Sequence, residues 1–161
     1  MSKLKTLALM LIACFGMQCS SAQNQTHDQK EVTASFSENQ SILAETNNGN
    51  HYVNVASGDN IVFKITSTSG GDPKNDTQIK TELIFQISND NSSFEMKDVD
   101  NAYLQRHCRC IDAGFNLIKT GNIKGTKLKN GTWSLSIDVI AEGNDSQTAY
   151  PFIFKGDTNH N

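Results

Sequence analysis

The one cluster of reactive side chains in this sequence is His107-Cys108-Arg109-Cys110. Side chains on a β-strand repeat every second residue, so Cys108 and Cys110 would share one face and His107 would point to the other. An extended backbone places two such Cα atoms about 6.5–7 Å apart, at the upper limit for a disulfide. We therefore expect both cysteines on one strand, close enough to touch, with any disulfide between them strained and easily reduced.

The same two thiols support other interpretations. Two thiolates, together with His107 or a distant histidine, could bind a soft metal such as Cu(I) or Zn²⁺. Arg109 lies between the cysteines, and a nearby cation favours the reactive thiolate that redox chemistry needs. Cys108 and Cys110 could equally be buried small apolar side chains or a purely structural bridge. These interpretations predict different states of the two sulfur atoms.

Carboxylates and amides form weaker clusters. Residues 71–76 and 89–91 carry oxygen ligands that Ca²⁺ accepts, but neither has the spacing of a known calcium loop, and the same residue types favour turns. Asp98 and Asp100 are paired acids of the kind used in glycoside hydrolysis, without other site residues nearby. The sequence contains no nucleophile elbow, phosphate-binding glycine loop or zinc-binding His-Glu-x-x-His. We expect no cofactor.

Residues 1–22 have the pattern of a bacterial export signal. Lys3 and Lys5 precede an apolar stretch that runs to about Met17, and Ser20-Ser21-Ala22 supplies the small residues of a cleavage site. This segment is too short to span a membrane. We expect export to the periplasm, the cell surface or the exterior.

The processing of this signal has two alternatives. Cleavage after Ala22 would release a chain with two cysteines, Cys108 and Cys110, which is the even number expected in an oxidising compartment. Lipid attachment is the rival, since residues 11–14 resemble a lipobox ending at Cys14, and Cys19 follows a poorer match. We favour release, and we expect membrane contact only through such a lipid anchor.

Composition limits the fold and the partners. The 161 residues include 14 Lys and Arg against 17 Asp and Glu, and loss of the signal removes two bases and no acid. This acidic balance argues against nucleic acid as a partner. The richness in Asn, Ser, Thr and Gly favours turns and polar strand faces. We divide the mature chain into a flexible polar spacer (residues 23–38), one domain (39–156) and a polar tail (157–161).

Alternating apolar residues predict several strands in that domain. Residues 51–56 and 61–66 flank a tight turn and predict a hairpin, and residues 83–87 alternate in the same way. Residues 122–128 and 133–140 predict a second hairpin around Asn130-Gly131, a dipeptide typical of the type I′ turn. Glycines 121 and 125 in this hairpin indicate a bulge or a close approach of strands. Residues 94–111 fit a helix or a strand, and we favour a strand over 104–112 with a short helical turn near 97–102.

The aromatic residues allow two interpretations. Trp133, Tyr103 and Tyr150 could form a platform for a sugar. However, Trp133 is in register with the apolar residues that follow it on the same strand, Leu135, Ile137 and Val139. This register favours a core position for Trp133.

The patterns together predict an all-β domain, a single antiparallel β-sandwich that is immunoglobulin-like or related, with a small β-barrel as the alternative. The function that fits best is an exported, non-enzymatic binding or interaction module with a protein or glycan ligand. The alternative is an exported metal-binding or thiol-redox protein that uses Cys108 and Cys110. A small hydrolase is third.

Overall fold

The computed structural model describes residues 31–69, 78–97, 99–143 and 147–161, and this described part is built from ten β-strands. Strands account for 74% of it and there is no helix, so the prediction of an all-β antiparallel fold is confirmed. Near residues 97–102, where we predict a helical turn, the described residues form a β-turn in which the Ala102 N–H donates to the Val99 carbonyl. None of the described residues belongs to a helix that could cross a membrane.

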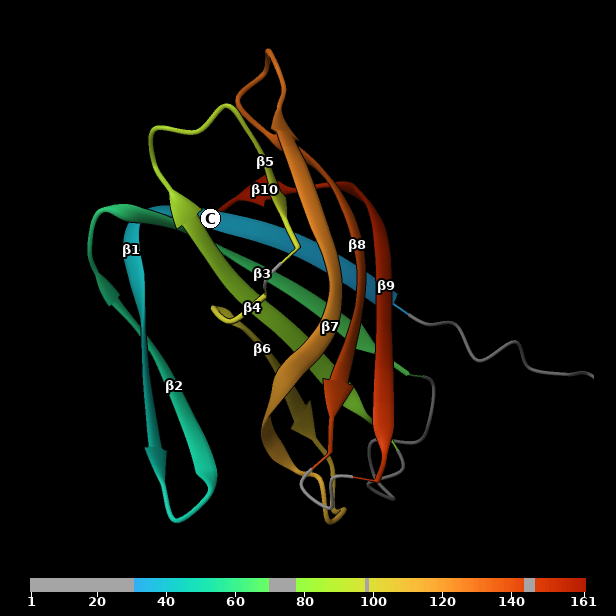
Figure 1. The fold of residues 1–161 in the computed structure, drawn as a ribbon. Helices are drawn as coiled ribbons and strands as arrows, with labels where there is room; N and C mark the ends of the chain where they lie inside the picture. Colours follow the sequence, from blue (N-terminus) through green and yellow to red (C-terminus); the bar gives the residue numbers. More distant parts are fainter. Residues whose placement is uncertain (1–30, 70–77, 98, 144–146) are drawn as a thin grey trace, which may run out of the picture.

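The strands are β1 (Glu31–Asn47), β2 (Asn50–Ser57), β3 (Asn60–Thr68), β4 (Lys80–Ser88), β5 (Ser93–Met96), β6 (Ala102–His107), β7 (Gly114–Lys127), β8 (Trp133–Glu142), β9 (Ala149–Asp157) and β10 (Asn159–His160). They connect in the order β10-β1-β3-β4-β6-β7-β8-β9, with β2 beside β1 and β5 beside β7. All pairs are antiparallel except the parallel pair β1–β10. The result is sandwich-like or barrel-like (Figure 1).

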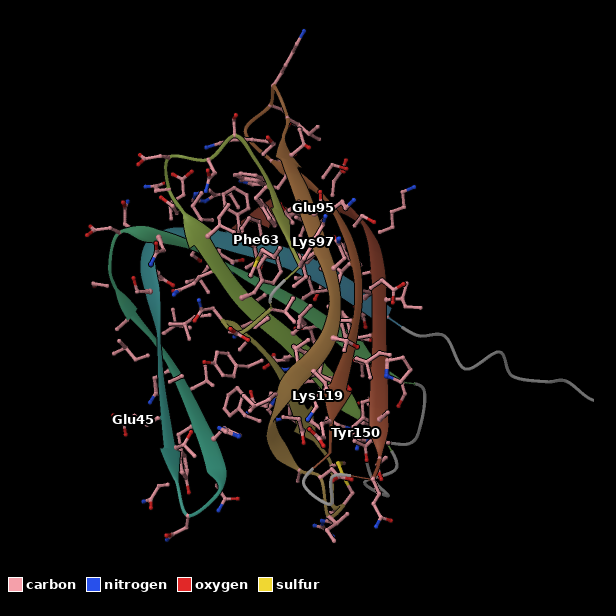
Figure 2. All side chains as sticks on the ribbon, in the orientation of Figure 1. Glu45, Phe63, Glu95, Lys97, Lys119 and Tyr150 are labelled. Carbon is pink, nitrogen blue, oxygen red and sulfur yellow. A yellow bond between two sulfur atoms is a disulfide. The ribbon has the colours of Figure 1, made fainter. Side chains whose placement is uncertain are left out.

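The long strand β7 carries the chain from one layer to the other. Its first residues pair with β6, and residues 118–127 pair with β8. The inward faces of β3, β4 and β6 therefore meet those of β8 and β9 across one apolar core (Figure 1). Figure 2 shows Phe63 in this interior. The largest fully buried side chains include Trp133, Phe36, Phe63, Phe85, Leu104, Ile123, Leu135, Ile137 and Val139.

The predicted C-terminal hairpin is confirmed, but its turn is not type I′. Only Gly131 has positive φ, at 86°, whereas type I′ needs it at both central residues. The Leu128 N–H donates to the Thr132 carbonyl at 2.7 Å, and the Gly131 N–H donates to the Leu128 carbonyl at 3.0 Å. The loop is thus longer than a two-residue turn, and one glycine supplies its left-handed position. Bulge and close approach are both present as predicted, because the register shifts between Ile118 and Thr120 and a Cβ on Gly125 would meet the Phe94 ring.

The predicted pairing of residues 51–56 with 61–66 is wrong. Strands β2 and β3 both pair with β1, β2 with its residues 40–47 and β3 mainly with its residues 31–37. A register shift between Ser37 and Gln40, with Asn39 at φ 57°, separates the two halves. The hairpin of residues 40–57, called the arm below, therefore leaves the sheet (Figure 1). Its tip is a type I′ turn, since Asn48 and Gly49 have φ of 52° and 80°.

The arm contacts the sheet at its base and near its tip. At its base the Ile42 N–H donates to Oε1 of Gln86 on β4, and near its tip His51 pairs with Phe115 on β7. Four buried apolar residues lie outside the main core: Val53 of the arm, and Val62, Ile84 and Tyr103 of the layer beneath. Val53 is thus the one buried apolar side chain of the arm.

The structure corrects both predicted boundaries of the domain. Residues 31–38, which we assign to the flexible spacer, form the first half of β1, and residues 31–37 pair with β3. The predicted tail is also ordered, because β9 runs to Asp157 and β10 pairs with Ser35 and Phe36. Backbone hydrogen bonds explain both errors, since polar side chains do not prevent a strand from completing a sheet. The export signal, with Cys14 and Cys19, lies outside the described residues.

Candidate ligand-binding site

Cys108 and Cys110 form a disulfide whose Cα atoms are 5.3 Å apart. They do not lie on a strand, because β6 ends at His107 and residues 108–112 form a bend and a turn. The prediction of a strand over 104–112 is therefore right only up to His107. A bent backbone brings the two Cα atoms closer than an extended one can, into the usual range for a disulfide. The ease with which this bond is reduced stays a prediction.

His107 interacts with Glu82 and not with the two cysteines. Its Nε2 is 3.3 Å from Oε2 of Glu82, whose other oxygen is 2.7 Å from Nζ of Lys80. Burial raises the pKa of Glu82, but hydrogen bonds from Lys80 and His107 and the charge of Lys64 outweigh burial and lower it overall. His107 thus belongs to an ion-pair group on the outer face of β4 and β6.

A metal site at the cysteines does not form in this state, because sulfurs in a disulfide are not thiolates. In the described ranges no three His, Cys, Asp or Glu side chains are grouped so as to hold a metal. Residues 89–91 form an exposed turn. Residues 71–76 and Asp98 lie outside the described residues.

The strand register builds a row of polar side chains on the inner face of three strands. Ser67 of β3 pairs with Thr81 of β4, and Thr81 pairs with Arg106 of β6. The next row toward the middle of the core is apolar: Ile65, Leu83 and Leu104. The inner face thus changes from apolar to polar at the end of the sandwich that carries the disulfide loop.

Arg106 continues into a cluster with two other side chains. Its Cζ lies 3.8 Å from the centroid of the Tyr150 ring, and the Tyr150 hydroxyl donates to Oδ2 of Asp112. This hydrogen bond to the carboxylate raises the pKa of Tyr150, and burial adds to the effect. Nη1 of Arg106 is 4.0 Å from the same Asp112 oxygen. Figure 2 shows Tyr150 on β9 at this end of the molecule.

Asn116 holds the loop that follows the disulfide. This residue is buried, and its Nδ2 lies within 3.2–3.4 Å of the carbonyl oxygens of Leu104, Asp112 and Gly114. Its Oδ1 is buried and has no hydrogen-bond donor among the described residues. A buried oxygen that accepts no hydrogen bond lowers the stability of the fold.

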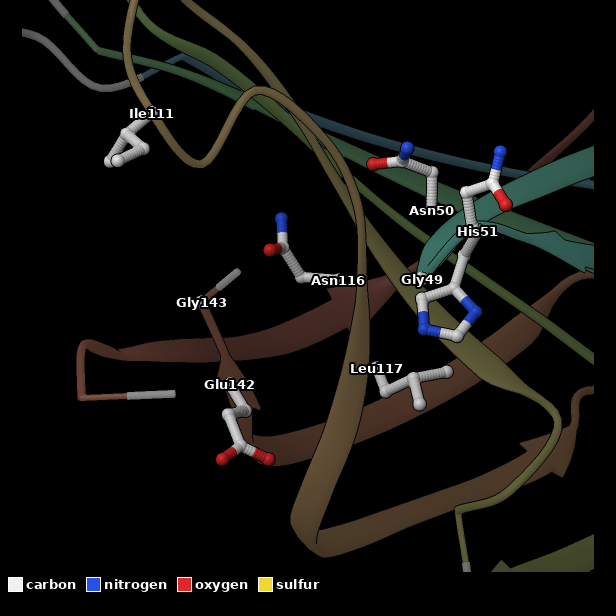
Figure 3. Close-up of a pocket in the computed structure, with 9 residues that line it drawn as sticks. Gly49, Asn50, His51, Ile111, Asn116, Leu117, Glu142 and Gly143 are labelled. Atoms are coloured by element: carbon white, nitrogen blue, oxygen red, sulfur yellow. The ribbon is translucent and has the colours of Figure 1, made fainter. Parts of the chain in front are cut away.

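Two cavities flank this cluster. The larger, of about 480 Å³, lies between the arm tip, the loop before β7 and the end of β8 (Figure 3). Its walls are mostly polar, with two exposed apolar side chains: Ile111 (79% exposed) and Leu117 (42%). Its lining residues are Asn48, Gly49, Asn50, His51, Ile111, Asn116, Leu117, Glu142 and Gly143.

The smaller cavity, of about 270 Å³, opens at the end of the core. The polar row of Ser67, Thr81 and Arg106 forms one wall, and Tyr150 and Phe152 of β9 form another. Ser69, Ile79, Leu104 and Pro151 complete the lining.

The aromatic platform for a sugar, the less favoured of the two interpretations of Trp133, does not form. Trp133 is fully buried in the core, as its register predicts. Tyr103 faces the outer side of its sheet, where it pairs with Ile84 and Leu117, and Tyr150 lies on β9. Burial of the Trp133 ring removes the surface that a sugar would need.

Sequence reasoning missed Arg106, Asp112 and Asn116. One signal for Arg106 was present, because Ala102, Leu104 and Arg106 follow one another at strand spacing and place a cation in line with core residues. The proximity of Asp112 and Tyr150, which are 38 residues apart, depends on the packing of β9 against the rest of the fold. Comparison of the chain with protein-family models, curated proteins and solved structures finds no match.

Proposed function

We propose that the protein is an exported, non-enzymatic binding module that holds a polyhydroxylated ligand, such as a glycan, in the larger cavity at the arm tip. The pattern of residues 1–22 supports export. The observation that carries the binding role is the cavity itself. Its volume of about 480 Å³ lies in the range of small-molecule sites, and its walls combine hydrogen-bonding groups with exposed apolar carbon.

The polar lining suits neighbouring hydroxyl groups. The side chain of Asn50 offers an amide donor and acceptor, and His51 offers its second ring nitrogen, since Nδ1 already pairs with the Thr46 hydroxyl. Glu142 offers Oε1 of its carboxylate, because Oε2 accepts from Nζ of Lys119 at 2.6 Å. Figure 3 shows these side chains reaching the cavity from different segments of the chain.

The apolar lining suits the carbon face of a sugar ring. Ile111 and Leu117 are large aliphatic side chains that line the cavity and are exposed to solvent. Burial of their surface by a ligand is favourable by about 25 cal/mol for each Å². The same ligand would cover both kinds of wall.

The proposal is tested with a panel of oligosaccharides immobilised on an array, followed by calorimetric titration of the best ligand. Asn50→Ala should weaken binding about fivefold to tenfold, the effect of one hydrogen bond. Asn54→Ala is the matched control, because Asn54 is an exposed residue of the same type on β2 and does not line the cavity. The proposal is wrong if no oligosaccharide binds, or if the two variants bind equally well.

A further inference from the structure

The smaller cavity has a different chemistry from the larger one. Its polar wall is a row of side chains from three neighbouring strands, Ser67, Thr81 and Arg106, fixed by the strand register. Backbone pairing on both sides holds Thr81 in place. The strand register therefore fixes this wall of the cavity, and Ser69 and Ile79 of the β3–β4 connection complete the lining.

The guanidinium of Arg106 is oriented by an aromatic ring, and its ion pair with Asp112 is long. The Tyr150 ring fixes its position from one side at 3.8 Å, and the Arg106 side chain is only 12% exposed. Among the described residues, Asp112 provides the one carboxylate oxygen within 4.0 Å, and that distance is too long for a hydrogen bond. The same oxygen already accepts the Tyr150 hydroxyl. A guanidinium carries five N–H donors in a fixed fork, and this ion pair does not use them.

Hydroxyl donors face the same cavity. Oγ of Ser69 accepts the Ile79 N–H at 3.0 Å, so its own proton can be donated elsewhere. Ser67 and Thr81 add two further hydroxyls to the lining. Leu104, Pro151 and Phe152 supply apolar walls, which lower the local dielectric and strengthen the interaction of a bound charge with Arg106.

We propose that the cavity lined by Arg106, Thr81, Ser67 and Ser69 binds the carboxylate group of a small ligand. The planar fork of Arg106 matches the two oxygens of a carboxylate, and the hydroxyl groups bond to its remaining lone pairs. The cavity of about 270 Å³ leaves room for a small body against Leu104 and Phe152.

The charge balance of the site favours a monoanion. Asp112 partly offsets the single charge of Arg106, so a doubly charged phosphate would leave a half-buried charge uncompensated. One carboxylate, held by charge-assisted hydrogen bonds, avoids that cost. This site is separate from the proposed glycan cavity, and its test does not depend on a ligand there.

The test uses two pairs of probes, each followed by calorimetry and by amide and arginine side-chain NMR shifts of the full chain. Glucuronate is compared with glucose, and N-acetyl-leucine with its amide, so that each pair differs in the carboxylate. We expect at least one acid to bind saturably and to shift the Arg106 signal, while its neutral match does neither. Tighter binding of a sugar acid or of an amino-acid carboxylate identifies the source of the group. The proposal is overturned if neither acid binds at millimolar concentration, if acid and neutral match bind alike, or if inorganic phosphate binds more tightly.

Three variants assign the effect to this cavity. Arg106→Gln should weaken binding of the acid at least tenfold, and Arg106→Lys at least fivefold, because lysine keeps the charge but lacks the fork. Arg109→Gln is the matched control, since Arg109 is exposed and outside the lining, and it should stay within twofold. Thr81→Val removes one hydroxyl with little change of volume and should weaken binding about threefold or more, which keeps the proposal testable if the Arg106 variants fail to fold. Equal effects of the Arg106 and Arg109 substitutions contradict it.

Discussion

The β7–β8 hairpin and the arm contain the same Asn-Gly dipeptide at their tips but are stabilised in different ways. In β8 every second side chain from Trp133 onward is buried in the main core. In the arm most side chains are exposed, and Leu43 is 55% exposed. The turns differ too, since both Asn48 and Gly49 have positive φ, whereas only Gly131 has it in the other hairpin. Packing thus dominates one hairpin, and turn geometry with a few contacts dominates the other.

The sharpest test of this difference is truncation of one buried and one exposed aliphatic side chain. Ile137→Ala should lower the free energy of unfolding by about 2–5 kcal/mol, because it empties a site that is 1% exposed. Leu43→Ala on the arm should cost less than about 1 kcal/mol, since most of its surface is already in water. Urea melts measure both values.

A control on the opposite face of β8 checks the register. Ser136→Ala should change stability by less than about 0.5 kcal/mol, because Ser136 is exposed. Comparable losses in the Ile137 and Leu43 variants would show that the arm is packed as tightly as the core.

Sequence reasoning succeeded for the packed β7–β8 hairpin and failed for the pairing of the exposed arm. The alternation of Trp133, Leu135 and Ile137 predicts β8 correctly, because burial of one face imposes a period of two. The alternation of Val53 and Val55 predicts a strand equally well but does not specify its partner. The Asn48-Gly49 dipeptide was the available signal for pairing β2 with β1, because a type I′ turn joins adjacent strands.

Of the candidate site, the sequence predicted proximity of Cys108 and Cys110, and the structure joins them. It could not predict the bend that removes them from β6, because local β-propensity does not include the geometry of the disulfide. The two cavities could not be predicted from the sequence either. Their walls come from strands far apart in the sequence, so they depend on the order of strands in the sheet.

Two glycine substitutions compare the cost of steric overlap in the β7–β8 hairpin with the cost of backbone strain at the tip of the arm. Gly121 on β7 has φ of 142°, and a Cβ there would meet the backbone of β8 at Asp138 and Val139. Gly121→Ala should therefore cost about 2–4 kcal/mol through strain and overlap together. Gly49 has φ of 80° but open space around it, so Gly49→Ala should cost only about 1 kcal/mol. Thermal and urea unfolding report both, and a larger loss at Gly49 would mean that turn geometry outweighs packing.

The disulfide extends the comparison to a purely local restraint. Its loop spans a sequence separation of two, so few unfolded conformations are excluded. Replacing Cys108 and Cys110 together by Ser should lower stability by at most about 1.5 kcal/mol. Thiol counting after denaturation, with and without reductant, verifies the bond in the parent protein. Two free thiols without reductant would contradict it, and equilibration with glutathione buffers tests the predicted ease of reduction.

The smallest expected effect on stability concerns Glu82, on the outer face of β4. The direction in which this effect changes with pH distinguishes it from other effects. The pKa of Glu82 is lowered below 4.5, because hydrogen bonds and charges from Lys80, Lys64 and His107 outweigh the opposing effect of burial. A carboxyl group with a lowered pKa in the folded state stabilises the fold above its unfolded pKa, and this contribution is lost as the pH falls through the folded value. The parent protein should therefore exceed Glu82→Gln in stability at neutral pH, and the difference should shrink below about pH 4.5.

Glu45→Gln, on the exposed arm (Figure 2), is the control for Glu82→Gln. It removes the same charge from the protein, but Glu45 is exposed in the arm, whereas Glu82 is buried and accepts hydrogen bonds from Thr66 and Lys80. Urea melts of all three proteins between about pH 7 and pH 3 separate a contribution of the Glu82 group from a general effect of net charge. If Glu82→Gln and Glu45→Gln show the same dependence on pH, net charge alone accounts for it, and the ion-pair group around Glu82 contributes nothing of its own.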